Sequence, residues 1–245
     1  MAKSIFLAGA SGAIGQRLVP LLVRAGHHVA GMTRSKDKVE GLRALGAVPV
    51  VVDVFEMSAL KDAMQMAAPD VVIHQLTDLA LLADPARLQE ALERNARLRI
   101  EGTANLVAAA LLSGARRVIA QSISFVYEPG SQPYRESDPL KQSSDPRWSR
   151  TVQAVSALER EVTQTPGIEG IVLRYGHFYG LGTGRERAEA PPKGALHVDA
   201  AAHAALLAVE RGRAGIYNIA EDDGDVAIDK ARAELGFDPG YRPAS

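Results

Sequence analysis

The sequence predicts a doubly wound α/β fold built on a parallel sheet of about seven strands. Three observations lead to this fold class. Short apolar runs recur along the chain, amphipathic or Ala/Leu-rich stretches separate them, and a glycine-rich loop directly follows the first run. Near-continuous apolar strands that alternate with helices form right-handed βαβ units, and such units bury their parallel sheet on both faces.

The expected strands are short, mostly apolar runs that are bounded by glycine or polar residues, the pattern of strands buried inside a parallel sheet. In chain order they are Ser4–Ala8, His28–Thr33, Val48–Val52, Asp70–Gln75, Arg117–Gln121, Gly170–Arg174 and Gly215–Ile219. Their regular spacing leaves room for one crossover helix between most neighbours, which is what parallel strands require.

The stretches between these runs carry apolar residues at helical spacing. They are Ile14–Ala25, Lys36–Leu45, Met57–Ala67, Pro85–Ser113, Val152–Thr165 and Asp199–Arg211, with one short helical piece at Ile228–Leu235. Segments 123–150 and 178–198 break the alternation, and we expect them to form substrate loops or a lid beside the ligand site. Residues 220–245 are expected to form a short appendage, so that the chain, 1–245, is one domain.

Composition excludes several classes of function. A size of 245 residues and 26.1 kDa suits one α/β domain, and a net charge of −1 with a pI near 6.6 shows no basic excess, which disfavours nucleic acid or an anionic membrane as a partner. The chain has no cysteine for disulfides or thiol catalysis, and its six histidines show no metal-ligand spacing. We also expect no signal peptide and no membrane span, and therefore a cytoplasmic protein.

The glycine-rich loop points to a dinucleotide. It reads Gly9-Ala10-Ser11-Gly12-Ala13-Ile14-Gly15 and lies between the first strand and the first helix. Glycine permits a tight turn and close approach of the backbone to a pyrophosphate, while the N–H groups at the helix N-terminus point at the phosphates. The residues expected to bind there are Gly9, Ser11, Gly12, Ala13, Ile14 and Gly15.

The end of the second strand indicates which dinucleotide is bound. Folds that take NAD place an acidic residue about 20 positions after the loop, where it accepts from the ribose 2′-OH. Here the stretch 31–36 holds Arg34 and no carboxylate. A planar guanidinium can pair with a 2′-phosphate, and Ser35 and Lys38 can assist it, so the pattern favours NADPH/NADP+ over NAD(H). The alternative is that Arg34 is a solvated residue at the start of a helix.

Two further strand ends are expected to contact the same cofactor. Asp53 can accept from the adenine amino group while Val54 covers the ring, although an Asp that caps the next helix explains this position equally well. Gln75, Leu76 and Thr77 are expected to run beside the diphosphate and ribose.

A series of stretches extends the argument along the chain: AGASGAIG (8–15), VVDV (51–54), DVVIHQLT (70–77), EGTANLVAAALLSGARRVIAQS (101–122), GIVLRYGHFYGLG (170–182), HVDAA (197–201), GIYNIA (215–220) and KARAELGFDP (230–239). Together they resemble the extended and atypical branches of the short-chain dehydrogenase/reductase superfamily. The resemblance implies a Rossmann-type sheet and a nicotinamide cofactor. It also implies that Gln121, Tyr175, His177 and Phe178 lie near the nicotinamide.

The first departure from the family concerns its Tyr-x-x-x-Lys pair, which is followed by a Glu four residues beyond the Lys. If Glu159 is that Glu, then Thr151 and Val155 occupy the Tyr and Lys positions. In the family the Lys and the nicotinamide lower the tyrosine pKa, so that the phenol can exchange a proton with the reacting oxygen. Threonine and valine cannot do this.

The partnering residues also differ. The family's catalytic Ser or Thr position falls on Ile123, with Ser122 and Ser124 on either side, and its structural Asn becomes Arg99. We interpret Arg99 as part of a solvated helix face, with an arginine that faces an acidic substrate as the alternative. The second departure is a C-terminal substrate-binding or lid portion that is shorter than in extended members. It weighs against sugar-nucleotide chemistry.

These observations favour an NADPH-dependent ketone reductase without the Tyr–Lys acid. Its substrate would be a small, aromatic or polyketide-like molecule that stabilises its own oxyanion, and the pattern is similar to ketoreductases of the simocyclinone C7 type, which tailor aromatic polyketide antibiotics. Ser122 and His177 are the candidate catalytic residues. The alternatives are a catalytically silent NADP(H)-sensing regulator and a sugar-nucleotide epimerase. The family also implies a homodimer.

Overall fold

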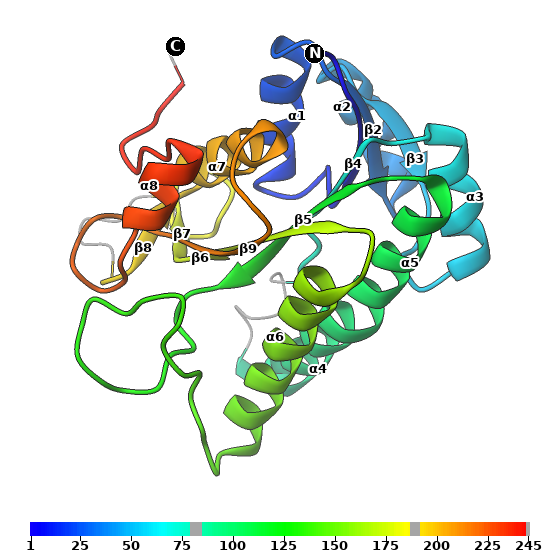
Figure 1. Cartoon of the computed structure of the whole chain (residues 1–245). Coiled ribbons are helices and arrows are strands. Elements are labelled where there is room, and N and C mark those ends of the chain that lie inside the picture. Colours follow the sequence, from blue (N-terminus) through cyan, green and yellow to red (C-terminus); the bar gives the residue numbers. More distant parts are fainter. Residues whose placement is uncertain (79–84, 187–191, 244–245) are drawn as a thin grey trace.

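Seven strands form a central sheet in the order β3-β2-β1-β4-β5-β6-β9 (Figure 1). The computed structural model describes residues 1–78, 85–186 and 192–243. The strands are β1 (Ser4–Ala8), β2 (His28–Thr33), β3 (Val48–Val51), β4 (Val71–His74), β5 (Arg117–Ile123), β6 (Glu169–Tyr175) and β9 (Gly215–Ile219). Every adjacent pair is parallel, which confirms the predicted doubly wound α/β class.

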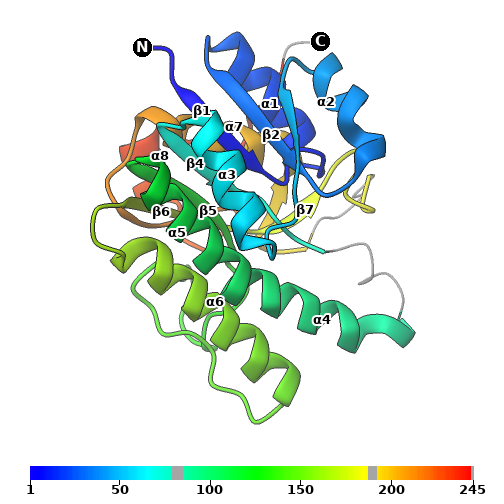
Figure 2. The same cartoon turned by 90° about the vertical axis from the view of Figure 1, so that its right-hand side faces the viewer.

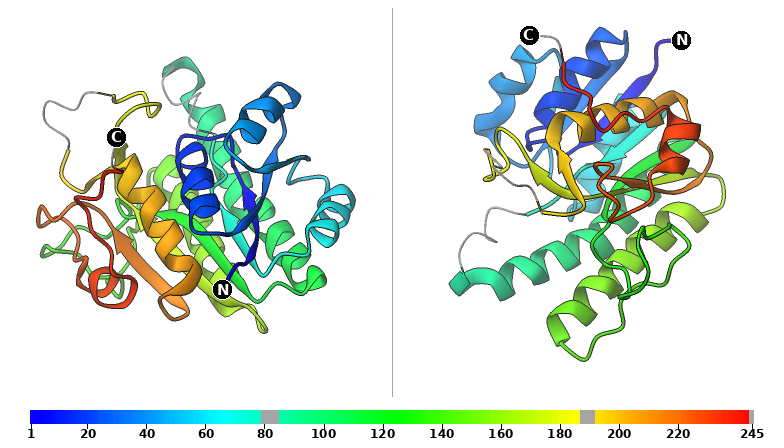
Figure 3. Two further views of the ribbon diagram at one scale, coloured as in Figure 1. Left: turned by 90° about the horizontal axis from the view of Figure 1, so that it is seen from above. Right: turned by 90° about the vertical axis from the view of Figure 1, so that its left-hand side faces the viewer.

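Helices cover both faces of the sheet (Figures 1 and 2). One face carries α1 (Gly15–Arg24), α2 (Val39–Ala44) and α7 (Val198–Glu210). The other carries α3 (Met57–Ala67), α5 (Thr103–Ser113) and α6 (Pro146–Gln164), and α4 (Leu88–Arg97) packs against α6. Seen from above, α1 in blue and α7 in orange lie side by side although they are far apart in the sequence (Figure 3).

Strand β1 shows how the sequence divides the core into two layers. Ile5 and Leu7 pack into the layer of α1 and α7, whereas Phe6 and Ala8 pack into the layer of α3 and α5. Successive side chains of a strand point to opposite faces, so a run that is apolar throughout belongs between two helical layers. Parallel pairing sets Ala8 opposite His74, and the carboxyl ends of β1 and β4 therefore meet at one edge.

A second, two-stranded sheet lies within the segment that the sequence predicts as a substrate loop or lid. β7 (His177–Tyr179) pairs in parallel with β8 (Ala195–His197). Strands of three residues are too short to show an alternating pattern, and each of these two pairs with a strand that is distant in the sequence. Residues 187–191 of the expected lid lie outside the described residues.

The long helix expected at Pro85–Ser113 is divided into several elements. A 3-10 turn, η3 (Pro85–Arg87), leads into α4, and a π-helical turn, η4 (Leu98–Gly102), joins α4 to α5. Figure 3 shows α4 (teal) and α6 (yellow-green) extending together beyond the sheet. Their exposed ends therefore stand beside the edge where the strands finish.

Helix α6 begins at Pro146, earlier than the expected Val152. Asp145 caps it by accepting a hydrogen bond from Arg147 N at 2.9 Å, and Pro146 occupies the first turn, where its missing N–H has no cost. The Pro-, Ser- and Asp-rich composition of the preceding loop concealed this start signal.

The C-terminal appendage packs against the loop 123–150 and the sheet edge. Tyr134 N donates to Asp225 O, and Ala227 N donates to Tyr134 O, both within 2.9 Å. Helix α8 (Asp229–Leu235) lies in this appendage, and a 3-10 turn, η1 (Lys36–Lys38), leads from β2 into α2. In the part of the chain that the structure describes, every helix is too short or too polar to cross a membrane.

Candidate functional site

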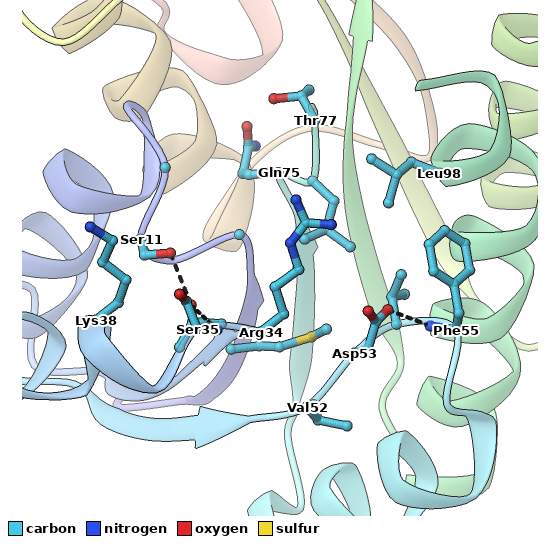
Figure 4. A pocket seen from close by; sticks show the side chains of 16 residues that line it. Ser11, Arg34, Ser35, Lys38, Val52, Asp53, Phe55, Gln75, Thr77 and Leu98 are labelled. Atoms are coloured by element: carbon cyan, nitrogen blue, oxygen red, sulfur yellow. Dashed lines mark hydrogen bonds between the residues drawn. The ribbon is translucent and has the colours of Figure 1, made fainter. Parts of the chain in front are cut away.

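A cleft of about 220 Å³ opens where β1, β2, β3 and β4 end, under the glycine-rich loop (Figure 4). It brings together these residues that the sequence predicts as cofactor ligands: Gly9, Ser11, Gly12, Arg34, Ser35, Lys38, Asp53, Val54, Gln75, Leu76 and Thr77. Sequence reasoning missed Met32, Thr33, Val52, Phe55 and Leu98, which also line the cleft. These are mostly apolar side chains, which sequence alone does not distinguish from core.

The glycine loop forms a cradle that has no space for side chains. Gly9 has φ of +88°, and a Cβ added there would lie 2.6 Å from the carbonyl oxygen of Gln75. Gly12 N donates to Gly9 O at 3.0 Å, which closes the turn. Ala13, Ile14 and Gly15 fall outside the residues that line the cleft. Ile14 and Gly15 are buried, and a Cβ on Gly15 would collide with the carbonyl oxygen of Gly9.

Polar side chains at the end of β2 face the cleft. Thr33 Oγ1 lies 3.1 Å from Ser11 Oγ and accepts from Ser35 N at 3.2 Å, so the loop and the strand end are tied together. Arg34 is 61% exposed, and its Nη2 lies 3.5 Å from Asp78 Oδ2. Asp78 is a contact that the sequence did not indicate. The guanidinium of Arg34 is therefore accessible to a ligand.

Asp53 resolves one of the alternatives left open by the sequence. Its Oδ1 accepts a hydrogen bond from Phe55 N at 3.0 Å, and the N-cap of α3 is Glu56. Asp53 therefore supports the turn after β3 and does not cap the helix. Its side chain still lines the cleft (Figure 4), and Val54 is also a lining residue.

A second cavity, of about 390 Å³, adjoins the first and shares Thr77 with it. Its wall consists of Thr77, Leu92, Asn95, Arg99, Gln121, Ile123, Phe125, Thr151, Gly176, His177, Phe178, Thr183, Gly184 and Arg185. Gln121, His177 and Phe178, which the sequence placed at the nicotinamide, are thus brought together. The elements that supply the wall are α4, η4, β5, α6 and β7.

His177 stacks on Phe125, with ring centroids 4.0 Å apart and an interplanar angle of 12°. Desolvation, and then the positive charge of Arg185, lower the pKa of His177 below its usual value. The imidazole is therefore neutral near pH 7 and can donate or accept one hydrogen bond at each ring nitrogen.

The positions of the missing Tyr and Lys have different surroundings. Thr151 lines the cavity, and its Oγ1 donates to Arg147 O at 2.9 Å. Val155 is fully buried and packs with Ile123 and Val126. Among the cavity-lining residues of the described chain there is no tyrosine and no lysine. The wall therefore offers no phenol–ammonium pair for proton transfer.

The structure does not bring Ser122 and Tyr175 to either cavity. Ser122 is 1% exposed, and its hydroxyl donates to Glu159 Oε1 at 2.8 Å. The same carboxylate accepts from Arg174 at 2.7 and 2.8 Å. Tyr175 is also buried, donates to Ala201 O at 3.2 Å, and has a raised pKa because of burial. These side chains stabilise the sheet beneath the site.

Arg99 lies in the cavity wall, which excludes its interpretation as part of a solvated helix face. The sequence signal was present, because Arg99 stands where the family has a structural Asn. The π-helical turn η4 changes the helical register at Arg99, and nothing in the sequence indicated that turn. No group of His, Asp and Glu side chains in the described ranges is arranged to hold a metal ion.

A seven-stranded parallel sheet, a glycine cradle at its first crossover and an adjoining second cavity define a protein of the short-chain dehydrogenase/reductase class. More specifically, the chain belongs to the NAD dependent epimerase/dehydratase family, whose sequence profile matches residues 5–193. Its fold is similar to that of UDP-glucose 4-epimerase from Thermotoga maritima, with 19% identity, a TM-score of 0.76, and coverage of 97% of this chain and 94% of that one. At this identity the likeness concerns the fold.

Sequence relatives add information about activity. The chain is 40% identical over 238 residues to a 3-diazoavenalumate denitrifying reductase from Streptomyces sp., which covers 89% of this chain and 76% of that protein. It is 27% identical over 177 residues to a 4-hydroxy-2-methyl-3-oxo-4-farnesyl-3,4-dihydroquinoline-1-oxide ketoreductase from Stigmatella aurantiaca, covering 71% of this chain and 50% of that protein. Both relatives are named reductases, which supports an oxidoreductase-type activity.

Proposed function

We propose that this protein is an NADPH-dependent reductase that transfers a hydride to a ketone of a small aromatic, polyketide-like molecule without a Tyr–Lys acid. The observation that carries the proposal is the wall of the second cavity. It contains Phe125, Thr151 and His177, and none of its described residues is a tyrosine or lysine. A substrate that stabilises its own oxyanion, such as a ketone beside a phenol or within a quinone, suits such a wall.

The first cleft fits a nicotinamide dinucleotide, which supplies the hydride when bound. Gly9 and Gly12 bring backbone to the cleft, where N–H groups can approach a pyrophosphate, and Gly9 can pack this close to Gln75 only because it has no Cβ. The buried Gln75 Oε1 has no hydrogen-bond partner among the described residues. A ribose hydroxyl would satisfy that oxygen. Arg34 and Lys38 provide positive charge for a 2′-phosphate, which supports NADPH over NADH. Thr77, at the junction of the two cavities, would hold the nicotinamide end.

The chain's own residues position the substrate and exclude water. Phe125, His177 and Phe178 provide flat surfaces for a conjugated ring, and the neutral His177 can hydrogen-bond a substrate oxygen. In a ketone beside a phenol, the phenolic proton lies next to the oxygen that receives negative charge. The substrate then supplies the proton, and solvent restores it after release.

A second candidate is the reductive removal of an aromatic diazo group. The specific observation that favours it is the 40% identity to the denitrifying reductase. Here the electron pair of the hydride forms a new C–H bond, while the electron pair of the broken C–N bond leaves with N2. A phenolate oxygen on the same ring recovers its proton from solvent. No proton has to come from a side chain, so this reaction also suits a cavity without a tyrosine or lysine acid.

The decisive experiment is loss of NADPH absorbance with quinones, aromatic ketones and an ortho-quinone diazide. An alcohol or hydroquinone product supports carbonyl reduction, whereas N2 in the headspace and an arene C–H supports the diazo reaction. Tight NADPH binding without oxidation by any compound would favour a sensing regulator and refute the reductase. Loss of turnover in His177→Gln, whose amide can still hydrogen-bond a substrate oxygen, with NADPH binding intact would restore a side-chain acid.

A further inference from the structure

We propose that Arg99 binds a negatively charged oxygen of the substrate, a carboxylate or a phenolate, so that the cavity selects anionic aromatic molecules. The inference rests on the proposed function in one respect, since it assigns the substrate to the same second cavity. It adds a charge requirement that neither the cofactor nor the reaction type specifies.

The first observation is that Arg99 has no acceptor of its own. Its half-buried side chain lines the cavity, yet it makes no hydrogen bond or ion pair with any residue in the described ranges. Two arginines on the preceding helix, α4, are paired. Arg94 lies 2.8 Å from Glu90, and Arg97 lies 2.7 Å from Glu101. A guanidinium has five N–H donors. Unpaired donors in a cavity wall indicate a ligand that accepts hydrogen bonds from them.

The second observation is an excess of positive charge around Arg99. The opposing charge that acts on Arg99 is that of Glu159, and both Glu159 oxygens already accept from Arg174. Two guanidinium groups therefore share one carboxylate in a desolvated region. Burial lowers the pKa of Arg99 to about 10, so it remains protonated at neutral pH. An anionic ligand would provide the missing negative charge, and its oxygens would accept hydrogen bonds from the guanidinium N–H groups of Arg99.

The third observation is the shape of the surrounding wall. Leu92, Ile123, Phe125 and Phe178 provide apolar and aromatic surface around Arg99. A neighbouring recess of about 300 Å³ shares Leu92, Phe125 and Thr151 with the cavity and adds Trp148. No Asp or Glu lines the cavity in the described part of the chain, and Arg185 lies at its exposed side. These surfaces match a flat, conjugated body with an acidic group.

A role in cofactor binding is the competing explanation for Arg99. Leu98, the preceding residue, lines the first cleft, whereas Arg99 lines the second cavity alone. The phosphate-binding backbone of Gly9 and Gly12 lies in the first cleft. The geometry therefore assigns Arg99 to the substrate, and the binding experiment separates the two roles.

The test measures equilibrium binding by calorimetry, with and without NADP+, and needs no turnover. Trans-cinnamate is compared with its neutral isostere cinnamamide, and 4-nitrophenolate with 4-nitroaniline, so that carboxylate and phenolate are distinguished. The wild-type protein should bind at least one anion about 10- to 100-fold more tightly than its neutral partner. Arg99→Met should abolish this preference, and Arg99→Lys should restore part of it. Arg43→Met, at an exposed arginine that lines neither cavity, is the matched control.

Three results would overturn the proposal. Wild-type protein that does not prefer either anion would exclude an anion site. An equal loss of anion and neutral binding in Arg99→Met would indicate a packing role. A loss of NADP+ affinity in the same variant would indicate a cofactor ligand. Absence of NADPH oxidation with retained anion preference would instead reject the proposed reaction and leave the site intact.

Discussion

The buried network of Glu159 leads to a sharp prediction about stability. Its Oε1 accepts from Ser122 Oγ and Arg174 Nε, both at 2.8 Å, and its Oε2 accepts from Arg174 Nη2 at 2.7 Å. The Arg174 and Glu159 side chains are only 4% and 6% exposed. In Glu159→Gln the shape is kept while the negative charge is removed, which leaves Arg174 buried and uncompensated with Arg99 nearby.

Removing one partner of a buried pair costs about 3–5 kcal/mol. For a domain of this size, about 1 kcal/mol lowers the Tm by about 2–4 °C, so Glu159→Gln should melt about 6–20 °C below wild type. The assay is thermal unfolding followed by circular dichroism. Ser122→Ala removes one hydrogen bond from the same carboxylate and should cost about 1 kcal/mol.

The matched control is Glu101→Gln, which removes a carboxylate from an exposed helical ion pair with Arg97. Such a pair contributes about 0.3–0.5 kcal/mol, so this variant should melt close to wild type. A Glu159→Gln protein whose Tm lies within about 2 °C of that of Glu101→Gln would refute the reasoning. It would show that Arg174 finds another acceptor or reaches water.

Three further predictions concern the cofactor cleft and pH. Arg34→Met should raise the Kd of NADPH by about 10- to 100-fold in a fluorescence titration and leave that of NADH nearly unchanged, because only NADPH carries the 2′-phosphate. Gly9→Ala should abolish binding of both dinucleotides, since its Cβ would lie 2.6 Å from Gln75 O. Burial, and then Arg99, lower the pKa of His74 to about 4 from 6.5. The fold therefore favours neutral His74. Above about pH 6.5 the His74 side chain is neutral in both folded and unfolded protein, and stability is at its full value. As the pH falls toward 4 only the unfolded chain binds the proton, so about 3 kcal/mol of stability should be lost. Urea unfolding of His74→Asn should show a smaller loss.

Each of these expectations has a contrary outcome. Parallel losses of NADPH and NADH affinity in Arg34→Met would mean that the guanidinium does not recognise the 2′-phosphate. Normal dinucleotide binding by Gly9→Ala would show that the loop relaxes at little cost. Identical pH profiles for wild type and His74→Asn would assign the acid-induced loss of stability to other groups.

The fold was predictable because its signals are local and repeated. The apolar runs that became β1 and β2 carry the two-faced burial of a parallel sheet, and their bounds agree with the structure. β7 and β8 were missed because each has only three residues and pairs with the other, as in His177 with Ala195, which is distant in the sequence. The early start of α6 was missed because its cap lies in a loop-like composition.

The candidate site could be predicted where backbone chemistry dictates it. The Gly9 turn and the charged end of β2 at Arg34 need particular residue types, and both line the cleft. Ser122 shows the limit of this reasoning. A hydroxyl at the end of a strand can face the ligand or the core, and its direction here depends on Glu159, which is distant in the sequence. Tertiary partners of this kind leave no local pattern.

The π-helical turn at Leu98–Gly102 joins α4 and α5 into one continuous helical segment, so it fixes the rotation of α4 relative to α5. Upstream, α4 contributes Leu92 and Asn95 to the cavity wall, while downstream α5 buries Leu106 in the sheet core. Deleting a single residue between them would rotate one half against the other by about 100°. The segment therefore tolerates substitutions but not changes in length. A change of ligand preference is therefore more readily obtained by exchanging side chains along α4 and η4, such as Leu92 and Arg99, than by changing the length of this segment.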